Sequence, residues 1–289
     1  MTRQIALLAN PAAGRGDAHH VLDAVVTRLR SDGASVDLLT GTDEADSLAL
    51  ARAAVAAGAD TLVALGGDGM VHLATQAVAE TPTRLGVIAM GTGNDFVRSL
   101  GLPEDPLEAA DRVVHGAPRT LDAARCGERW FATVMAAGFD AAVNERANAM
   151  RWPHGDLRYT IAALAVLRRW QPVPYTLDLD GTQRQLEAML VCVANTDSYG
   201  GGLRIPWGAL PDDGLLDVIV IKPTSKLEFL KIFPSVRTGG HVDHPALERI
   251  QVPRVTVAAP GVTAYADGER FGALPLTVEC VPGALSVLV

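Results

Sequence analysis

Cysteine, basic charge and long apolar runs are all scarce in this chain of 289 residues. Cys126, Cys192 and Cys280 lie far apart and form no CxxC pair, so neither a disulfide framework nor a cysteine zinc site is indicated. Lys and Arg number 25 against 33 Asp and Glu, which gives a formal net charge of −8. Proteins that bind duplex nucleic acid usually present a basic surface to the phosphates, so we expect no nucleic-acid partner.

Apolar runs of the roughly eighteen residues that a membrane-spanning helix needs are absent as well. The apolar run near the N-terminus stops at Asn10-Pro11, too early for a signal peptide with its cleavage site. We therefore expect a cytoplasmic protein whose thiols are reduced and whose contact with a membrane is peripheral.

The first part of the chain alternates short apolar runs with alanine-rich amphipathic stretches, a pattern typical of βα units. Strands are predicted over residues 5–9, 36–39, 61–65 and 85–89, and helices over residues 18–29, 45–57 and 71–79. Strands joined by such helices form a parallel sheet, and ligands of such sheets bind beyond the carboxyl ends of the strands. The loops that follow these strands are therefore the first place to look for a site.

After Pro118 the apolar runs lengthen and Asp-Gly turn signals recur, which predicts mainly antiparallel β-structure, a sandwich or a distorted barrel. Its strands are predicted over residues 130–136, 175–179, 185–194, 216–221, 254–258, 276–281 and 284–289. The segment 144–170 is the exception, because its arginines alternate with Met150, Trp152, Tyr159 and Trp170 as in an amphipathic helix. We expect an α/β domain over residues 1–118 and a β-sandwich domain over residues 119–289.

Three loops rich in glycine follow predicted strands. NPAAGRG (residues 10–16) holds small residues that let backbone N–H groups approach an anion at a helix N-terminus. GGDGM (66–70) surrounds Asp68 with three glycines; this carboxylate could cap the next helix, but a cap needs no such glycines. GTGND (91–95) follows the next predicted strand and again combines glycines with a carboxylate, that of Asp95. The G-x-G-x-x-G and G-x-x-x-x-G-K-[ST] motifs are absent.

These loops are expected to meet at one edge of the parallel sheet. They would bring together backbone donors, Thr92 and the carboxylates of Asp68 and Asp95. Backbone N–H groups suit phosphates, and carboxylate oxygens suit Mg²⁺. The arrangement therefore favours a magnesium nucleotide as the ligand.

The motifs NPAAG (10–14), GGDGM (66–70), GTGNDF (91–96) and YADGE (265–269), in this order and spacing, resemble the diacylglycerol kinase catalytic family. That family includes bacterial diacylglycerol kinases, sphingosine kinases and ceramide kinases, and the soluble bacterial diacylglycerol kinases are the most similar. Segment 195–217 resembles the second domain of the family. The resemblance implies a phosphofructokinase-like or NAD kinase-like α/β domain, a C-terminal β-sandwich, ATP between them, and a lipid alcohol such as diacylglycerol as acceptor.

The resemblance also implies site residues. Asp267 would be the general base, and Glu269 would lie close to the metal and phosphates. From the loop carboxylates themselves we expect Asp68, and Asp95 through water, to hold the Mg²⁺ of the nucleotide. A further Mg²⁺ would bind Asp213 with backbone oxygens of Leu210 and Leu215. By the resemblance, the nucleotide would be held by Asn10, Pro11, Ala12, Ala13, Gly14, Thr40, Gly66, Gly67, Asp68, Gly69, Met70, Val71, His72 and Thr92. The loop after the fourth predicted strand adds Gly91, Gly93, Asn94 and Asp95.

Four positions depart from the family pattern. Met70 stands where Thr is frequent, His72-Leu73 stand where Asn-Glu is frequent, and Ala13 stands where Ser is common. The acidic residue expected after the second phosphate loop is therefore missing, and a leucine cannot replace an oxygen ligand of Mg²⁺.

Plainer interpretations stand beside the functional ones. Asp267-Gly268 and Asp212-Asp213-Gly214 are typical turn sequences, and segment 144–170 could pack on its own domain rather than touch an anionic membrane.

Other functions of the same fold stay open. A GGDG loop is shared with NAD kinases and phosphofructokinases, and sphingoid bases or ceramide could replace diacylglycerol as the acceptor. A member that binds nucleotide or lipid without catalysis would act as a sensor. Strand edges in the second domain could pair across a homodimer.

Overall fold

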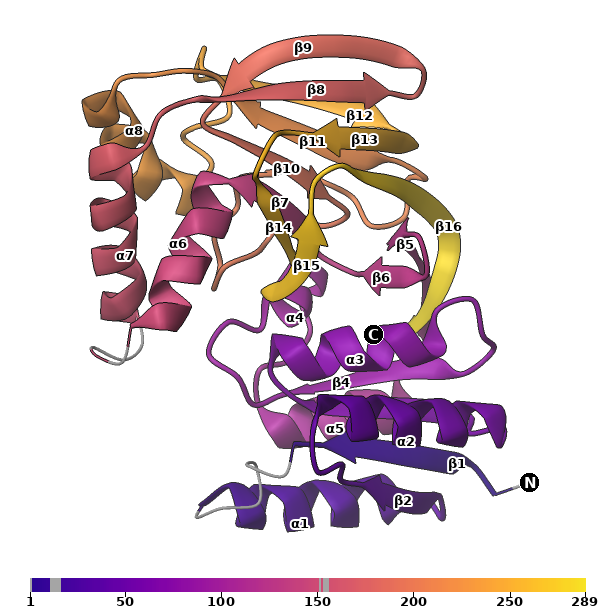
Figure 1. The fold of residues 1–289 in the computed structure, drawn as a ribbon. Helices are drawn as coiled ribbons and strands as arrows, with labels where there is room; N and C mark the ends of the chain where they lie inside the picture. Colours follow the sequence, from indigo (N-terminus) through magenta and orange to yellow (C-terminus); the bar gives the residue numbers. More distant parts are fainter. Residues whose placement is uncertain (1, 11–16, 151, 153–155) are drawn as a thin grey trace.

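The first part of the computed structural model is a parallel sheet between two layers of helices (Figure 1). The structure describes residues 2–10, 17–150, 152 and 156–289. The parallel strands follow the order β2-β1-β3-β4, and they are β1 (Gln4–Ala9), β2 (Ser35–Leu39), β3 (Thr61–Gly66) and β4 (Arg84–Ala89). Because β1, β3 and β4 are neighbours and parallel, their carboxyl ends meet at one edge, as the sequence predicts.

Alternating side chains of the strands are buried on both faces of this sheet. Ile5 and Leu7 pack against α1 (Asp17–Arg30) and α5 (Pro106–His115). Ala6 and Leu8 face the opposite layer, α2 (Glu44–Ala56) and α3 (Asp68–Val78). The short helix α4 (Asp95–Leu100) follows β4 and precedes α5.

The second part is a sandwich of two antiparallel layers. One layer is a separate sheet in the order β12-β11-β10-β7-β14-β15. The other layer belongs to the large sheet, which continues past β4 as β16-β13-β8-β9, with β5 and β6 at its side. Phe131, Tyr175, Val191, Val218 and Val255 from the two layers share one apolar core. This arrangement confirms the predicted fold class.

The strands of this part have the following bounds: β5 (Pro118–Cys126), β6 (Arg129–Phe131), β7 (Val134–Gly138), β8 (Val173–Leu179), β9 (Thr182–Ala188), β10 (Leu190–Ala194), β11 (Leu216–Ile221), β12 (Leu247–Val252), β13 (Arg254–Ala258), β14 (Thr263–Ala266), β15 (Glu269–Ala273) and β16 (Leu276–Leu288). Segment 130–136 is broken between β6 and β7, and segment 185–194 divides at Met189 between two sheets. Segments 276–281 and 284–289 join as β16, with an irregularity between Val281 and Leu285.

β16 ties the two parts together. It pairs with β13 in the sandwich and with β5, and it reaches β4 of the α/β part, where Val287 lies opposite Leu85. β5 begins at Pro118, where we propose the domain boundary, so the last strand of the chain crosses back over that boundary.

Three helices cover the outer face of the separate sheet, and Figure 1 shows them grouped at one side of the sandwich. They are α6 (Phe139–Ala149), α7 (Asp156–Arg169) and α8 (Lys226–Ile232), and a 3₁₀ turn (Phe233–Arg237) follows α8. The single helix predicted over 144–170 is therefore two helices. None of the described helices is long and apolar enough to cross a membrane.

Candidate functional site

A cavity of about 690 Å³ lies where the α/β part meets the sandwich. One end is polar and includes Asp68, Thr92, Gly93, Asp95, Thr133 and Asp267. The other end is mainly apolar, with Phe139, Val143, Leu164, Leu167, Phe229 and Leu230 from α6, α7 and α8, and the first two of these helices also contribute Asp140, Asn144, Tyr159 and Thr160. One cavity thus joins loops suited to phosphate with a pocket suited to hydrocarbon.

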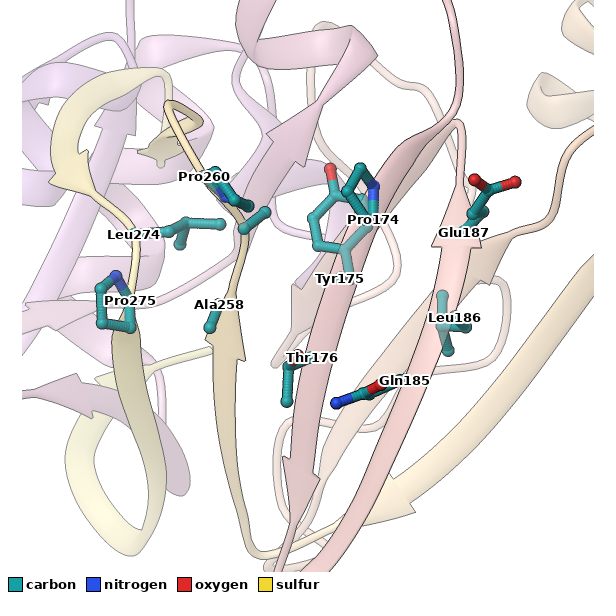
Figure 2. Close-up of a pocket in the computed structure, with 11 residues that line it drawn as sticks. Pro174, Tyr175, Thr176, Gln185, Leu186, Glu187, Ala258, Pro260, Leu274 and Pro275 are labelled. Atoms are coloured by element: carbon teal, nitrogen blue, oxygen red, sulfur yellow. The ribbon is translucent and has the colours of Figure 1, made fainter.

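A second hollow, of about 640 Å³, lies over β8, β9 and β13 (Figure 2). Among the described residues that line it, Tyr175 and Glu187 are the titratable ones. The Tyr175 hydroxyl donates a hydrogen bond to the carbonyl of Ala137, at 3.2 Å. This hollow lacks the glycine loops and clustered carboxylates of the first cavity, which we therefore take as the candidate site.

The loops after β3 and β4 lie in contact at the polar end. A Cβ atom added to Gly91 would lie 2.6 Å from the Cα of Gly67, so this position has no room for a side chain. The Asn94 side chain closes the same loop, because its Oδ1 accepts from the Gly91 N–H at 3.1 Å and its Nδ2 donates to the Gly91 carbonyl at 3.0 Å. Glycine at position 91 is thus required by close backbone approach, whatever ligand binds there.

Asp68 starts α3, and its carboxylate reaches the beginning of α4. Oδ2 accepts from the Asn94 N–H at 2.9 Å and Oδ1 accepts from the Asp95 N–H at 2.7 Å. Asp68 therefore caps a helix, but the following one rather than its own. Burial and the nearby Asp95 carboxylate raise the pKa of Asp68 to about 6 despite these bonds. Two neighbouring carboxylates of this kind favour a bound cation.

Asp95 connects the two parts of the protein. Its Oδ1 accepts from the Ser198 hydroxyl at 2.9 Å and from the Gly202 N–H at 2.8 Å, and its Oδ2 accepts from the Gly201 N–H at 2.9 Å. The residue is 6% exposed. Three of about four acceptor positions of a carboxylate are thus filled, which leaves Asp95 less free than Asp68 to bind a metal.

Asp267 and Gly268 form the two-residue turn between β14 and β15. Both have a positive φ, 52° and 85°, as a type I′ hairpin turn requires. The Asp267 side chain nevertheless points inward and lines the cavity. The turn interpretation and the placement in a site are therefore compatible.

Four donors surround the Asp267 carboxylate. Oδ1 accepts from the Thr133 N–H at 2.9 Å and from the Thr133 hydroxyl at 2.6 Å, and Oδ2 accepts from the Ala132 N–H at 3.1 Å. The His72 Nδ1 atom lies 2.9 Å from Oδ2. Burial alone would raise the pKa of Asp267, but the bonds from His72 and Thr133 outweigh it, so the pKa lies below its usual value.

Glu269, the first residue of β15, lies over the start of α3. A Cβ atom added to Gly69 would be 3.3 Å from Glu269 Oε1. Residues from the two ends of the chain thus meet at one place: Asp68, Gly69, Thr92, Gly93, Asp95, Asp267 and Glu269.

Other predicted site residues lie elsewhere. Met70 and Leu73 are buried in the core of the α/β part, so the side chain of Met70 is not available to a nucleotide. Asn10 and Thr40 are exposed and do not line the cavity. Pro11, Ala12, Ala13 and Gly14 fall outside the described residues.

The turn proposed for a second Mg²⁺ lies away from the cavity. Asp213 is exposed; its Oδ1 accepts from the Leu215 N–H at 3.0 Å and its Oδ2 accepts from the Gln251 side chain at 3.3 Å. The buried Asp122 carboxylate holds the same turn through the Gly214 N–H, at 2.7 Å. Within the described ranges no three His, Cys, Asp or Glu side chains cluster as a metal site. Backbone oxygens would therefore have to complete any metal shell here.

The cavity contains polar residues that the sequence did not indicate: Thr133, Arg98, Arg237, Asp140 and Tyr199. The Tyr199 hydroxyl donates to Asp140, and burial raises the pKa of that carboxyl to about 6. Arg98 could have been found, since it lies one helical turn after the GTGND loop. Tyr199 lies in segment 195–217, which resembles the second domain of the family, although nothing there assigns it to a site. Thr133, Arg237 and Asp140 come from distant segments and form no local motif.

Comparison with known proteins agrees with this geometry. The family model for the diacylglycerol kinase catalytic domain matches residues 4–126, and the model for the YegS C-terminal NAD kinase beta sandwich-like domain matches residues 133–289. A diacylglycerol kinase of Mycobacterium tuberculosis (strain H37Rv) is 43% identical over 292 residues, covering 99% of this chain and 94% of that protein. A diacylglycerol kinase of Bacillus subtilis (strain 168) is 28% identical, with 93% and 90% coverage.

Solved structures share the fold. A diacylglycerol kinase from Bacillus anthracis superposes with a TM-score of 0.81 at 25% identity, covering 99% of this chain and 96% of that one. An NAD kinase from Archaeoglobus fulgidus in complex with ATP gives a TM-score of 0.56 at 15% identity, covering 99% and 93%, which shows a common fold alone. The resemblance read from the four motifs is confirmed, and the chain belongs to the diacylglycerol kinase family, a family of lipid kinases.

Proposed function

We propose that this kinase transfers the γ-phosphoryl group of ATP to the hydroxyl of a lipid alcohol, with diacylglycerol as the preferred acceptor. The observation that carries the proposal is the cavity itself. Its polar end is lined by Asp267 and by Asp68, Thr92 and Gly93 from the loops after β3 and β4, and its other end lies between α6, α7 and α8. A phosphate donor and a hydrocarbon chain could therefore occupy one continuous space.

Phosphoryl transfer requires in-line placement, charge neutralisation and a base for the alcohol proton. The acceptor oxygen would form a bond to the γ-phosphorus while the bond from that phosphorus to the bridging oxygen of ATP breaks. ADP leaves with the electron pair of the broken bond, and the alcohol proton passes to the Asp267 carboxylate. The products are a lipid phosphate and ADP.

Backbone N–H groups of the glycine loops would bind the phosphates, with Thr92 beside them. Asp68 is the side chain best placed to hold Mg²⁺, because it lines the cavity and retains free acceptor positions. Such an ion would neutralise phosphate charge. Glu269 would lie next to this group, and Asp213 with the carbonyls of Leu210 and Leu215 would hold a separate structural Mg²⁺.

The apolar end opens toward helices that also carry exposed apolar side chains. Leu157 on α7 and Leu227 on α8 are 56% and 73% exposed. Basic residues lie near Leu227: Lys226 starts α8, and its Nζ donates to the carbonyl of Arg168, which with Arg169 forms the end of α7 opposite Leu157. Apolar and basic side chains together suit an anionic lipid surface. We propose that this face contacts the membrane that supplies the acceptor.

A transfer assay tests the acceptor. ATP labelled in the γ-phosphate and Mg²⁺ would be incubated with diacylglycerol, a sphingoid base and ceramide in mixed micelles, with NAD as a further acceptor. We expect labelled phosphatidate to form faster than any other product. Preferential labelling of NAD would indicate that the chain acts as an NAD kinase instead of a lipid kinase. Absence of any product together with protection by ATP against thermal unfolding would instead indicate a sensor.

A further inference from the structure

Asp267 has a close partner from the other half of the chain. His72 lies on α3, and its Nδ1 is 2.9 Å from Oδ2 of a residue that follows 195 positions later. Both side chains are 4% exposed, so water is nearly excluded from the contact. A hydrogen bond to a carboxylate is stronger in such surroundings than at a surface.

The four donors around Asp267 are not equivalent. An ionised carboxylate offers about four acceptor positions, and the described residues fill all of them. The two backbone N–H groups are fixed by the chain between β6 and β7, and the imidazole is fixed by its burial on α3. The Thr133 hydroxyl alone can rotate away without a backbone movement. It also belongs to a residue that lines the cavity.

We propose that His72 is a positioning residue for phosphoryl transfer, whose Nδ1–H holds Oδ2 of Asp267 so that Oδ1 receives the proton of the acceptor alcohol. The incoming hydroxyl takes the position that the Thr133 hydroxyl now fills. This inference rests on the proposed role of Asp267 as the base. It replaces the nucleotide contact that the family resemblance implies for His72, because the imidazole faces the carboxylate instead.

Substitutions at position 72 can test the hydrogen-bond donor independently of the bulk of the imidazole ring. Asparagine also carries a nitrogen donor on Cγ, so His72→Asn can keep the bond to Asp267. His72→Gln moves the donor one atom further from the backbone. His72→Leu removes the donor and puts an apolar side chain of similar bulk in its place. The lipid kinase assay gives kcat and the KM for ATP of each variant, and thermal unfolding with and without ATP shows that each is folded.

We expect His72→Leu and His72→Gln to lower kcat roughly 10- to 100-fold, the effect of losing one hydrogen bond to a charged group. His72→Asn should restore kcat to within about threefold of the parent, and the KM for ATP should change less than about twofold in all three. Equal loss in the Asn and Leu variants would overturn the proposal. A raised KM for ATP at unchanged kcat would also overturn it, in favour of a nucleotide contact.

Two further outcomes keep the test decisive. If His72→Leu fails to fold, the comparison of His72→Asn with His72→Gln still decides, since both carry an amide and differ in its reach. If Asp267 is not the base, a separate result shows it: Asp267→Asn would then retain turnover, whatever the variants at position 72 do.

Discussion

At the scale of single residues, the site depends on carboxylates whose roles differ by environment. Asp267 is surrounded by four donors, Asp95 by three, and Asp68 by two. The sequence could nominate all three, because each lies in a glycine-containing motif. It could not show the coupling of His72 to Asp267, since no local pattern reports a contact between positions 195 apart.

Asp140 provides a prediction on pH. Its pKa is raised to about 6 by burial, which the bond from Tyr199 only partly offsets. The folded protein therefore holds this proton at a pH where the unfolded chain, with a pKa near 3.8, has lost it. The stabilisation is present at low pH and is lost as the pH rises from about 4 to about 6.

Asp140→Asn cannot ionise, so its free energy of unfolding should exceed that of the parent at pH 7.5, by on the order of 1–3 kcal/mol. The difference should shrink toward pH 4. Urea unfolding at both pH values measures it, with the exposed Asp37→Asn as the control. A difference that does not change with pH would show that Asp140 ionises normally.

The Thr133 hydroxyl gives a second prediction at this scale. If it merely occupies the acceptor position on Asp267 until the substrate arrives, Thr133→Val should retain kcat to within about tenfold. If the hydroxyl relays the proton, the loss should match that of Asp267→Asn. Steady-state kinetics of the two variants side by side distinguish the two roles.

At the scale of elements, periodicity predicted the four parallel strands and three of their helices to within a few residues. It missed β12, β14 and β15, and it could not see that the chain changes sheets at Met189. Sheet membership depends on pairing between distant strands, which an apolar run does not encode. The change of sheet between β6 and β7, at residues 132–133, was missed because it too depends on pairing with distant strands. The N–H groups of these two residues donate to Asp267.

The contact between the loops after β3 and β4 is testable. Gly91→Ala would place a Cβ 2.6 Å from the Cα of Gly67, whereas Gly67→Ala would place one 3.2 Å from the Cα of Gly91. The first change must displace the backbone and the second need move it only slightly. We expect Gly91→Ala to reduce kcat/KM for ATP by roughly 100-fold, as a misplacement near 1 Å can, and Gly67→Ala by clearly less. Equal effects would contradict the contact.

At the scale of the whole molecule, the two parts share β16 and are joined by Asp95. Asp95→Asn should lower the free energy of unfolding by about 2–3 kcal/mol, because an amide cannot satisfy all three donors. Asp105→Asn is the matched control, since asparagine can still cap α5. Urea unfolding of both variants tests this. Equal stabilities would show that the contact contributes little.

The proposed membrane face can be tested on the intact protein. Leu157→Glu with Leu227→Glu should abolish flotation with anionic vesicles, because the charges oppose entry into the lipid surface. Leu38→Glu with Leu107→Glu changes leucines that are 47% and 45% exposed on the α/β part and should leave flotation unchanged. Flotation that is equal in the two double variants would exclude this face.

The central claim is that Asp267 takes the proton of a lipid alcohol in a cavity shared with ATP. Its most direct test is the turnover of Asp267→Asn with labelled ATP and diacylglycerol in mixed micelles. We predict that turnover falls by at least roughly 10²–10⁴-fold while ATP still protects the variant against thermal unfolding. Turnover near that of the parent would contradict the account.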